Sequence, residues 1–379
     1  MAVLLEQAPA VAPTARTSPG LAQSRASTAD IHCFEPLADA RWDPFVQGHS
    51  RSSVFHTSAW LEALHRTYGY KLVAYSTSSP TEPLENAIVF GRVESWLTGR
   101  RLVSLPFSDH CEPLIGTEEA PGTIAAILNR ELQQSGWSYL EMRPLGTIPV
   151  TTPYVHTGIE YAFHQLDLRP DLHCLFNNFH KSCIQRKIRR AEREGLVYRE
   201  GSSEELLDVF CRLFELTRIK HRVPPQPRQW FRNLMNCLGP ALKIRVASKA
   251  DQPVAAMITL RHKGTMVYKY GCSDICFNHL GGMQLLYWNA IQEAKAAGLS
   301  CFDFGRTDAD QQGLITYKNR WGAIQSLLTY SRYGCSSRAT HCLDLSAGKW
   351  KARTAKYVLS HLPGGVVSKI GHFLYSHIG

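Results

Sequence analysis

The chain has 379 residues, enough for two domains that each bury a core of their own. Its composition, 44% apolar and 20% charged, is typical of a soluble globular protein, and no run approaches the ~20 apolar residues that span a bilayer. The formal net charge of +10 favours an anionic partner, such as nucleic acid, a phospholipid surface or a phosphorylated substrate.

The N-terminal residues and the cysteines bear on where the protein works. Residues 1–29 are rich in Ala, Pro, Ser and Thr, which predicts a disordered tail rather than a signal peptide. The 11 cysteines are scattered without CxxC pairs, and the closest two, Cys272 and Cys276, have no ligand neighbours at metal-binding spacing. An odd count in a long chain favours reduced thiols over a disulfide framework. We therefore expect a cytoplasmic protein without a metal site.

Residues 30–145 predict a first α/β domain. Thr57 or Ser58 is placed to cap a helix, and runs rich in β-branched and aromatic residues predict the strands. In chain order the expected elements are a helix at 56–68, strands at 71–76, 84–93 and 101–105, a loop at 108–116, a helix at 121–134 and a strand at 137–143. In the loop, Asp109, His110 and Glu112 are candidates to face a groove between two domains.

The same order of elements returns at 161–345, after a linker predicted at 146–160. The expected elements are a helix at 203–221, strands at 242–247, 254–260 and 265–272, a helix that begins at Gly282, and a strand at 301–304. The two halves share no residue-level repeat, so the pattern predicts a structural duplication only. The predicted fold class is therefore α/β, with two tandem units of one kind.

The stretch from Thr265 to Gly322 organises the second unit as strand, helix, strand. Gly281 and Gly282 open the helix, and Gly298 closes it as a residue free to adopt positive φ. The N–H groups at such a helix start have no intrahelical acceptor and are well placed to bind an anion. Gly281 and Gly282 are therefore candidate cofactor-binding residues.

The end of this stretch carries a family resemblance. The run FDFGRTDADQQGLITYKNRWGA, with the helix before it, resembles the C-terminal half of GNAT-like acyltransferases related to the Fem-type aminoacyl transferases, which build peptide bridges in bacterial cell walls. The matching residues are Asp303, Gly305, Arg306, Asp308, Gly313, Tyr317, Lys318, Trp321 and Gly322. The segment RKIRRAEREGL at 186–196 is similar to a basic helix of those proteins, and a weaker likeness runs over 54–114.

The resemblance implies two tandem GNAT-like (acyl-CoA N-acyltransferase) domains and an acyltransferase activity. The implied reaction transfers an acyl or aminoacyl group to an amine of a cell-wall or surface-polysaccharide precursor, which would be the anionic partner. Acyl-CoA and aminoacyl-tRNA both stay open as donors, because residues 279–282 only approximate the usual Q/R-x-x-G-x-G/A loop. The alternative enzyme is a CoA-dependent N-acetyltransferase that acts on an amino sugar in exopolysaccharide synthesis. Neither donor is expected to be tightly bound.

Acyl transfer to an amine requires a polarised carbonyl and a deprotonated amine held in contact, but no covalent nucleophile. The sequence accordingly has no GxSxG motif. Lys318 is the first candidate catalytic residue, because the rings of Tyr317 and Trp321 beside it would exclude water and strengthen its charge. Similar Fem-type enzymes use a lysine in this motif to stabilise the oxyanion or the leaving group. The alternative is a lysine that extends from a packed aromatic turn.

Further candidates surround Lys318. Asp303 and Arg306 flank a strand end, where α/β sheets present ligand groups. Asp303 is a candidate to orient the amine or accept its proton, and Arg306 to bind a carboxylate or phosphate, while an ion pair between them is the structural alternative. Period-two alternation places Tyr268 and Tyr270 on one face of the preceding strand, where they either line the cleft or pack in the core. Tyr317 and Trp321 are candidate substrate-binding residues as well.

A basic segment at 171–195 predicts a long helix. Arg186, Arg189 and Arg193 share one side of it at i, i+3 and i+7. Three guanidinium groups on one ridge suit phosphate groups, and a solvated charged face is the alternative. The resemblance implies that the anion would belong to a nucleotide-linked precursor or to aminoacyl-tRNA. A non-catalytic nucleic-acid-binding module is the rival interpretation of the same ridge.

Residues 346–379 form a basic, amphipathic C-terminal tail. The sequence Pro363-Gly364-Gly365 divides it into two helical segments. Packing against the protein's own domains is the favoured interpretation. Peripheral contact with an anionic inner membrane is the alternative.

Overall fold

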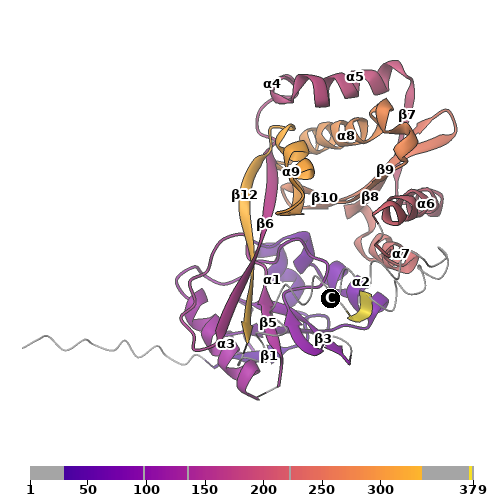
Figure 1. Ribbon diagram of the computed structural model, residues 1–379. Coiled ribbons are helices and arrows are strands. Elements are labelled where there is room, and N and C mark those ends of the chain that lie inside the picture. The colour runs from indigo at the N-terminus through magenta and orange to yellow at the C-terminus, as the bar shows by residue number, and fades with distance from the viewer. Residues whose placement is uncertain (1–29, 97–98, 135, 222, 335–374, 378–379) are drawn as a thin grey trace, which may run out of the picture.

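The computed structural model describes residues 30–96, 99–134, 136–221, 223–334 and 375–377 (Figure 1). The predicted N-terminal tail lies outside these residues. So does the C-terminal tail, except for the short helical turn at 375–377.

Every strand of the described residues belongs to a single 12-stranded sheet. From one edge to the other the order is β1 (His32–Phe34), β2 (Lys71–Ser76), β3 (Ile88–Ser95), β4 (Gly99–Val103), β5 (Tyr139–Met142), β12 (Ile324–Gly334), β6 (Val155–Asp167), β11 (Cys301–Asp308), β10 (Thr265–Ser273), β9 (Gln252–His262), β8 (Leu242–Lys249) and β7 (Leu196–Gly201).

The sheet confirms the predicted duplication. In the first half, β1 to β4 form an antiparallel run that ends in the parallel pair β4–β5. In the second half, β7 to β10 form an antiparallel run that ends in the parallel pair β10–β11. Each half is therefore one copy of the same α/β unit.

The two long strands β6 and β12 join the halves (Figure 1). They pair with each other along the whole of β12, while β12 also pairs with β5 and β6 also pairs with β11. Residues 155–160, predicted as linker, are part of β6. The prediction missed both strands because much of this ribbon is exposed to water, including the apolar Ile324 and Leu327, so neither strand has the pattern of a buried one.

Helices cover both faces of each half. In the first half these are α1 (Trp42–Gly48), α2 (Ser58–Tyr68), α3 (Ala120–Gln134) and the 3₁₀ turn η1 (Val54–His56). The predicted cap of α2 is present, since the hydroxyl of Thr57 accepts a hydrogen bond from the amide of Trp60.

The second half carries α4 (Leu172–Asn178), η2 (Lys181–Gln185), α5 (Arg186–Arg193), α6 (Glu204–Lys220), α7 (Arg228–Leu238), η3 (Gly239–Ala241), η4 (Ile275–Leu280), α8 (Gly282–Ala296) and α9 (Gln312–Asn319). Helices α5 and α8 lie on one face of its sheet, and α6 and α7 on the other (Figure 1). Helix α7 packs on α2 of the first half, where the rings of Trp60 and Trp230 are 5.4 Å apart. One apolar core thus runs through both halves.

The predicted basic helix at 171–195 is not continuous. Helix α4 ends at Asn178, and Phe179 and His180 have extended ψ values of 144° and 123° before a π-helical turn leads into α5. Phe179 is buried against the rings of Trp288 and Trp321, and the side-chain amide of Gln185 donates to its carbonyl. Tertiary packing of Phe179 therefore overrides the helical pattern.

Candidate active site

The site is built where strands β10 and β11 separate. Their parallel pairing covers only 265–267 against 301–303. A β-bulge at Lys269 then shifts the register of β10 against β9, and bulges bend a strand away from its neighbours. The register of β11 against β6 also shifts between Asp303 and Arg306. The two strands therefore diverge and leave space beside the start of α8.

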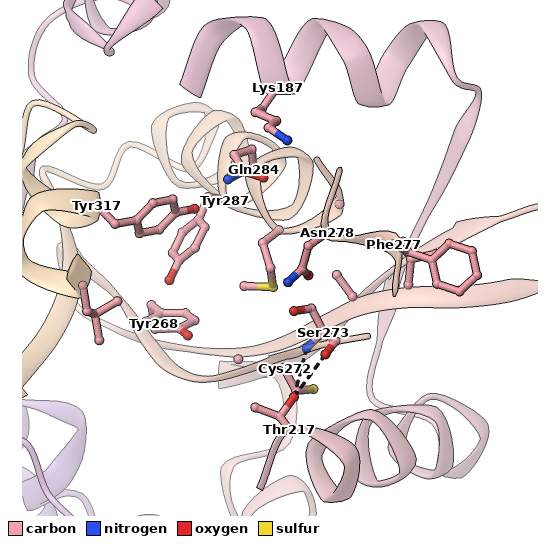
Figure 2. Close-up of a pocket in the computed structure, with 16 residues that line it drawn as sticks. Lys187, Thr217, Tyr268, Cys272, Ser273, Phe277, Asn278, Gln284, Tyr287 and Tyr317 are labelled. Carbon is pink, nitrogen blue, oxygen red and sulfur yellow. Dashed lines mark hydrogen bonds between the residues drawn. The ribbon is translucent and has the colours of Figure 1, made fainter. Parts of the chain in front are cut away.

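A cavity of about 400 Å³ occupies this space (Figure 2). Strands β9 and β10 form its floor, the first turn of α8 its back wall, and α9, η4 and Lys187 of α5 its rim. Tyr268, Tyr287 and Tyr317 gather at one end, with the rings of Tyr268 and Tyr287 4.8 Å apart. The polar side chain of Gln284 lies beside Lys187, and that of Asn278 lies near Ser273 (Figure 2).

The predicted helix start at Gly281 and Gly282 is confirmed. Gly281 adopts φ +85°, and a Cβ there would clash with the backbone carbonyl of Lys187. The first intrahelical bond joins the amide of Leu285 to the carbonyl of Gly281. The amides of residues 282–284 therefore precede the helical ladder, and all three residues line the cavity. With Lys187 facing them, they form a positive end of the cavity that favours an anionic group.

A cluster of charged side chains lies on the other side of the diverging strands, at the junction of the two halves. Asp109, from the first-half loop, accepts a hydrogen bond from Lys269 at 2.8 Å. The side chain of Lys269 is 6% exposed and lies over the rings of Phe55 and Trp60. Burial lowers the pKa of Lys269, whereas the ion pair outweighs burial for Asp109 and holds its pKa below the usual range.

Lys318, on α9, is buried in the same region. Its Nζ atom donates to the backbone carbonyls of Gly305 at 2.8 Å and of Arg306 at 3.2 Å. Burial lowers its pKa to about 8, while the carboxylates of Asp109 and Asp303 act in the opposite direction. Such a group is populated in both protonation states near neutral pH.

Lys318 is 3% exposed and does not line the cavity. Its Nζ atom is bonded to the carbonyl of Gly305, and the carbonyl of Tyr268, a residue of the cavity lining, is 3.7 Å from where a Cβ on Gly305 would stand. The candidate lysine is thus linked to the cavity lining through the backbone of Gly305 and Tyr268.

Asp303 and Arg306 do not form the ion pair that was the structural alternative. Asp303 is 1% exposed, and its Oδ1 accepts a hydrogen bond from the amide of Gly305 at 2.6 Å. Arg306 instead bonds to Asp308 at 3.1 Å and lies over the ring of Tyr161 at 4.3 Å. Arg306 therefore keeps a partly exposed guanidinium, whereas the carboxylate of Asp303 is enclosed by protein.

Two predicted substrate-binding residues are corrected by the structure. Because of the bulge at Lys269, Tyr268 and Tyr270 lie on opposite faces of β10. Tyr268 lines the cavity, but the hydroxyl of Tyr270 accepts a hydrogen bond from Trp230 in the core between the halves. Trp321 is completely buried beneath the cavity wall, so of the two aromatic residues beside Lys318 only Tyr317 lines the cavity.

The predicted arginine ridge is exposed. Arg186, Arg189 and Arg193 are on the solvent side of α5, and the guanidinium of Arg189 lies over Phe176 at 5.4 Å. None of the three lines the cavity, whose nearest basic group is Lys187. The ridge and the cavity are therefore separate features.

The prediction missed Lys187 and Lys269. Lys187 lies in a basic run, and nothing in the sequence distinguishes it from its basic neighbours. Lys269 sits in a strand between two tyrosines, and a lysine at such a position indicates either an edge or a buried partner. Only the fold shows that the partner is Asp109 of the other half.

Metal clusters and membrane-spanning helices are absent from the described residues. These residues contain no group of three or more His, Cys, Asp or Glu side chains arranged to hold a metal ion, and their cysteines are free. No helix among them has the length and apolarity needed to cross a bilayer.

Comparisons with known proteins agree with this architecture. Residues 179–319 match the family model of the acetyltransferase (GNAT) domain. The structure of FemX is similar with a TM-score of 0.61 at 12% identity, covering 79% of this chain and 96% of its own. A tandem GNAT protein from the clavulanic acid biosynthesis pathway has a TM-score of 0.51 at 11% identity, covering 81% and 100%. No curated protein matches the sequence.

A third similar structure is the C-terminal domain of an Agrobacterium fabrum protein described as a lysylphosphatidylglycerol synthetase. Its TM-score is 0.51 at 11% identity, covering 83% of this chain and 95% of its own. At such identities the similar structures establish the fold, and the domain match covers the cavity and Lys318. The chain is therefore an acyltransferase with two tandem GNAT-like domains, a fold it shares with FemX, and residues 179–319 match the acetyltransferase (GNAT) domain model.

Proposed function

We propose that the protein transfers an acyl or aminoacyl group to an amine of a cell-wall or surface-polysaccharide precursor. The observation that carries this proposal is the cavity at the start of α8, whose lining includes Tyr317, the residue directly before Lys318, a buried lysine with a lowered pKa. The likeness to FemX, at the level of fold, supports the choice of a cell-wall or surface-polysaccharide precursor as the amine acceptor.

The cavity is the proposed donor site. Its positive end, made by Lys187 and the first amides of α8, suits the phosphate groups that acyl-CoA and aminoacyl-tRNA share. The tyrosine-lined end suits the less polar part of the donor next to the acyl group. The acyl carbonyl would then lie in the gap between the two strands, and the acceptor would approach from the first half.

In the proposed reaction the amine nitrogen attacks the acyl carbon, a C–N bond forms, and the bond from that carbon to sulfur or oxygen breaks. The ammonium of Lys318 stabilises the negative charge that develops and gives a proton to the leaving atom. The amine loses one proton on becoming an amide. Because its pKa is about 8, neutral Lys318 then accepts that proton, and no net proton stays on the enzyme.

Turnover of Lys318 variants tests this role. With acetyl-CoA or aminoacyl-tRNA as donor and glucosamine as acceptor, Lys318→Met is expected to lose about 100-fold or more of the rate. Lys318→Arg keeps the positive charge but cannot give up its proton. It should therefore stabilise the developing negative charge and recover only part of the rate that Lys318→Met loses. The matched control is Lys181→Met, an exposed lysine of η2. A folded Lys318→Met enzyme that turns over at the wild-type rate would contradict the proposal.

The runner-up is a CoA-dependent N-acetyltransferase that acts on an amino sugar. It is favoured by the domain match, whose family is described as acetyltransferase. Thermal denaturation with acetyl-CoA, or with an aminoacyl-tRNA, separates the donors, because a bound donor stabilises the folded state. Lys187→Ala should weaken the shift caused by the true donor, whereas Lys181→Ala should not.

A further inference from the structure

His110 and Asp303 bring two nearly enclosed polar side chains together across the junction of the halves. His110, in the first-half loop, is 6% exposed, and Asp303, on β11, is 1% exposed. Nε2 of His110 lies 3.5 Å from Oδ2 of Asp303, an ion-pair distance rather than a short hydrogen bond. Within the described residues, Oδ2 of Asp303 and Nδ1 of His110 have no hydrogen-bond partner. A buried carboxylate oxygen without a hydrogen bond is unfavourable, and the nearby imidazole compensates it together with the charges of Lys269 and Lys318.

The other oxygen of Asp303 leads directly to Lys318. Oδ1 accepts the hydrogen bond from the Gly305 amide, and the Gly305 carbonyl accepts the bond from Nζ of Lys318. Gly305 adopts φ +69°, a conformation that only glycine adopts without strain. Asp303 therefore fixes a backbone turn whose carbonyl holds the ammonium.

His110 is itself held rigidly by the first half and by β6. The rings of Phe55 and Phe163 pack edge-on against the imidazole at 5.3 Å and 5.5 Å. The neighbouring backbone of the loop is fixed by Tyr330, whose hydroxyl donates to the carbonyl of Asp109 at 2.7 Å. The imidazole thus has a position that the first half determines.

We propose that His110 and Asp303 form a positioning pair through which the first half sets the Gly305 turn and thereby the ammonium of Lys318. The effect of this pair on acyl transfer rests on the proposed function, because a misplaced Lys318 would no longer contact the acyl carbonyl. Neither side chain lines the cavity, and in this proposal both act through Gly305, as positioning residues. The pair makes the GNAT domain at 179–319 dependent on the half of the chain before it.

Nuclear magnetic resonance of the full-length chain, with isotope-labelled glycine and lysine, tests the pair without a substrate. The Gly305 amide and the Lys318 ammonium are assigned by the loss of their signals in Gly305→Ala and Lys318→Arg. In His110→Leu we expect the Gly305 amide proton to move upfield, because its bond to the carboxylate weakens, and the Lys318 signal to move with it. His110→Gln, whose amide nitrogen can replace Nε2, should restore both signals.

His56→Gln is the matched control. His56 is also a buried histidine, and its Nε2 binds the same loop at the carbonyl of Glu112, but it does not contact Asp303. It should leave both signals in place, and an equal shift in this control would overturn the proposal. Unchanged signals in folded His110→Leu would also overturn it. If that variant does not fold, Asp303→Asn is measured, and it must move both signals.

The outcome is separable from that of the proposed function. If the signals move in His110→Leu while Lys318→Met retains full turnover, the positioning pair stands and the catalytic role of Lys318 falls. If Lys318→Met loses turnover while the signals stay fixed in His110→Leu, the catalytic role stands and the pair falls.

Discussion

At the scale of single residues, the buried ammonium of Lys318 has a consequence for folding. Its pKa is about 8 in the folded protein and 10.5 in an exposed lysine. Between these values the unfolded chain binds the proton that the folded protein has lost, so the free energy of unfolding rises with pH. Full passage through this window contributes on the order of 3 kcal/mol.

We therefore expect Lys318→Met to flatten the alkaline part of the stability curve. Urea denaturation at a series of pH values from neutral to strongly alkaline measures the difference between variant and wild type. The difference in the free energy of unfolding should change with pH mainly between about 8 and 10.5, the pKa values of Lys318 in the folded and unfolded protein. Parallel curves for the two proteins across the window would show that Lys318 is not desolvated as described.

Gly305 offers a second residue-scale prediction. Gly305→Ala combines left-handed backbone strain, at φ +69°, with a contact of 3.3 Å between the new Cβ and Oδ2 of Asp109. The matched control is Gly298→Ala, at φ +72° with open space around its Cβ. We expect about 1–2 kcal/mol of lost stability from the strain alone and a larger loss at Gly305. Equal losses of stability in Gly305→Ala and Gly298→Ala, measured by chemical denaturation, would contradict the close contact between Gly305 and Asp109.

At the scale of elements, η1 and the first-half loop are tied together by His56. Its Nε2 donates to the carbonyl of Glu112 at 2.9 Å, and its Nδ1 accepts from the amide of Ser53 at 3.0 Å. Complete burial lowers the pKa of His56 from 6.5 to about 3. As the pH falls below 6.5, the unfolded chain gains a proton that the folded protein does not bind, so stability falls.

His56→Gln should remove this acid sensitivity, because the amide can serve both hydrogen bonds without titrating. Relative to the variant, the wild type is expected to lose roughly 2 kcal/mol between neutral pH and about pH 5. Thermal or urea denaturation along this pH range measures the loss. An identical pH dependence in both proteins would contradict the assignment of a neutral buried imidazole.

The elements also show what the sequence could predict. Helices α2, α6 and α8 were predicted because capping residues and apolar periodicity are local signals. Strands β6 and β12 were missed because their alternation reflects a solvent-exposed ribbon that only the assembled sheet defines. The faces of Tyr268 and Tyr270 were assigned wrongly because one bulged residue reverses the alternation. Lys318 was selected from its motif, whereas its contact to Gly305 depends on tertiary structure.

At the scale of the whole molecule, the continuous sheet predicts that the two halves unfold together. Leu328, on β12, is fully buried and packs with Phe163 and Tyr330 between the halves. Leu328→Ala should cost about 2–5 kcal/mol, and hydrogen exchange should accelerate in β2 and β8 alike. The control is Leu327→Ala, whose side chain is 59% exposed. Faster exchange confined to one half would show that the halves are independent.

Occupation of the cavity by the acyl donor is the point on which the proposed function depends. Calorimetric titration of the full-length chain with acetyl-CoA, and separately with an aminoacyl-tRNA, measures it directly. Leu314→Trp places a large side chain at the cavity rim, where Leu314 is 41% exposed, while Leu327→Trp adds the same ring on remote β12. We expect one donor to bind the wild type and the Leu327 variant equally and the Leu314 variant about tenfold or more weakly. Equal binding to all three proteins, or binding of neither donor, would contradict a donor site in this cavity.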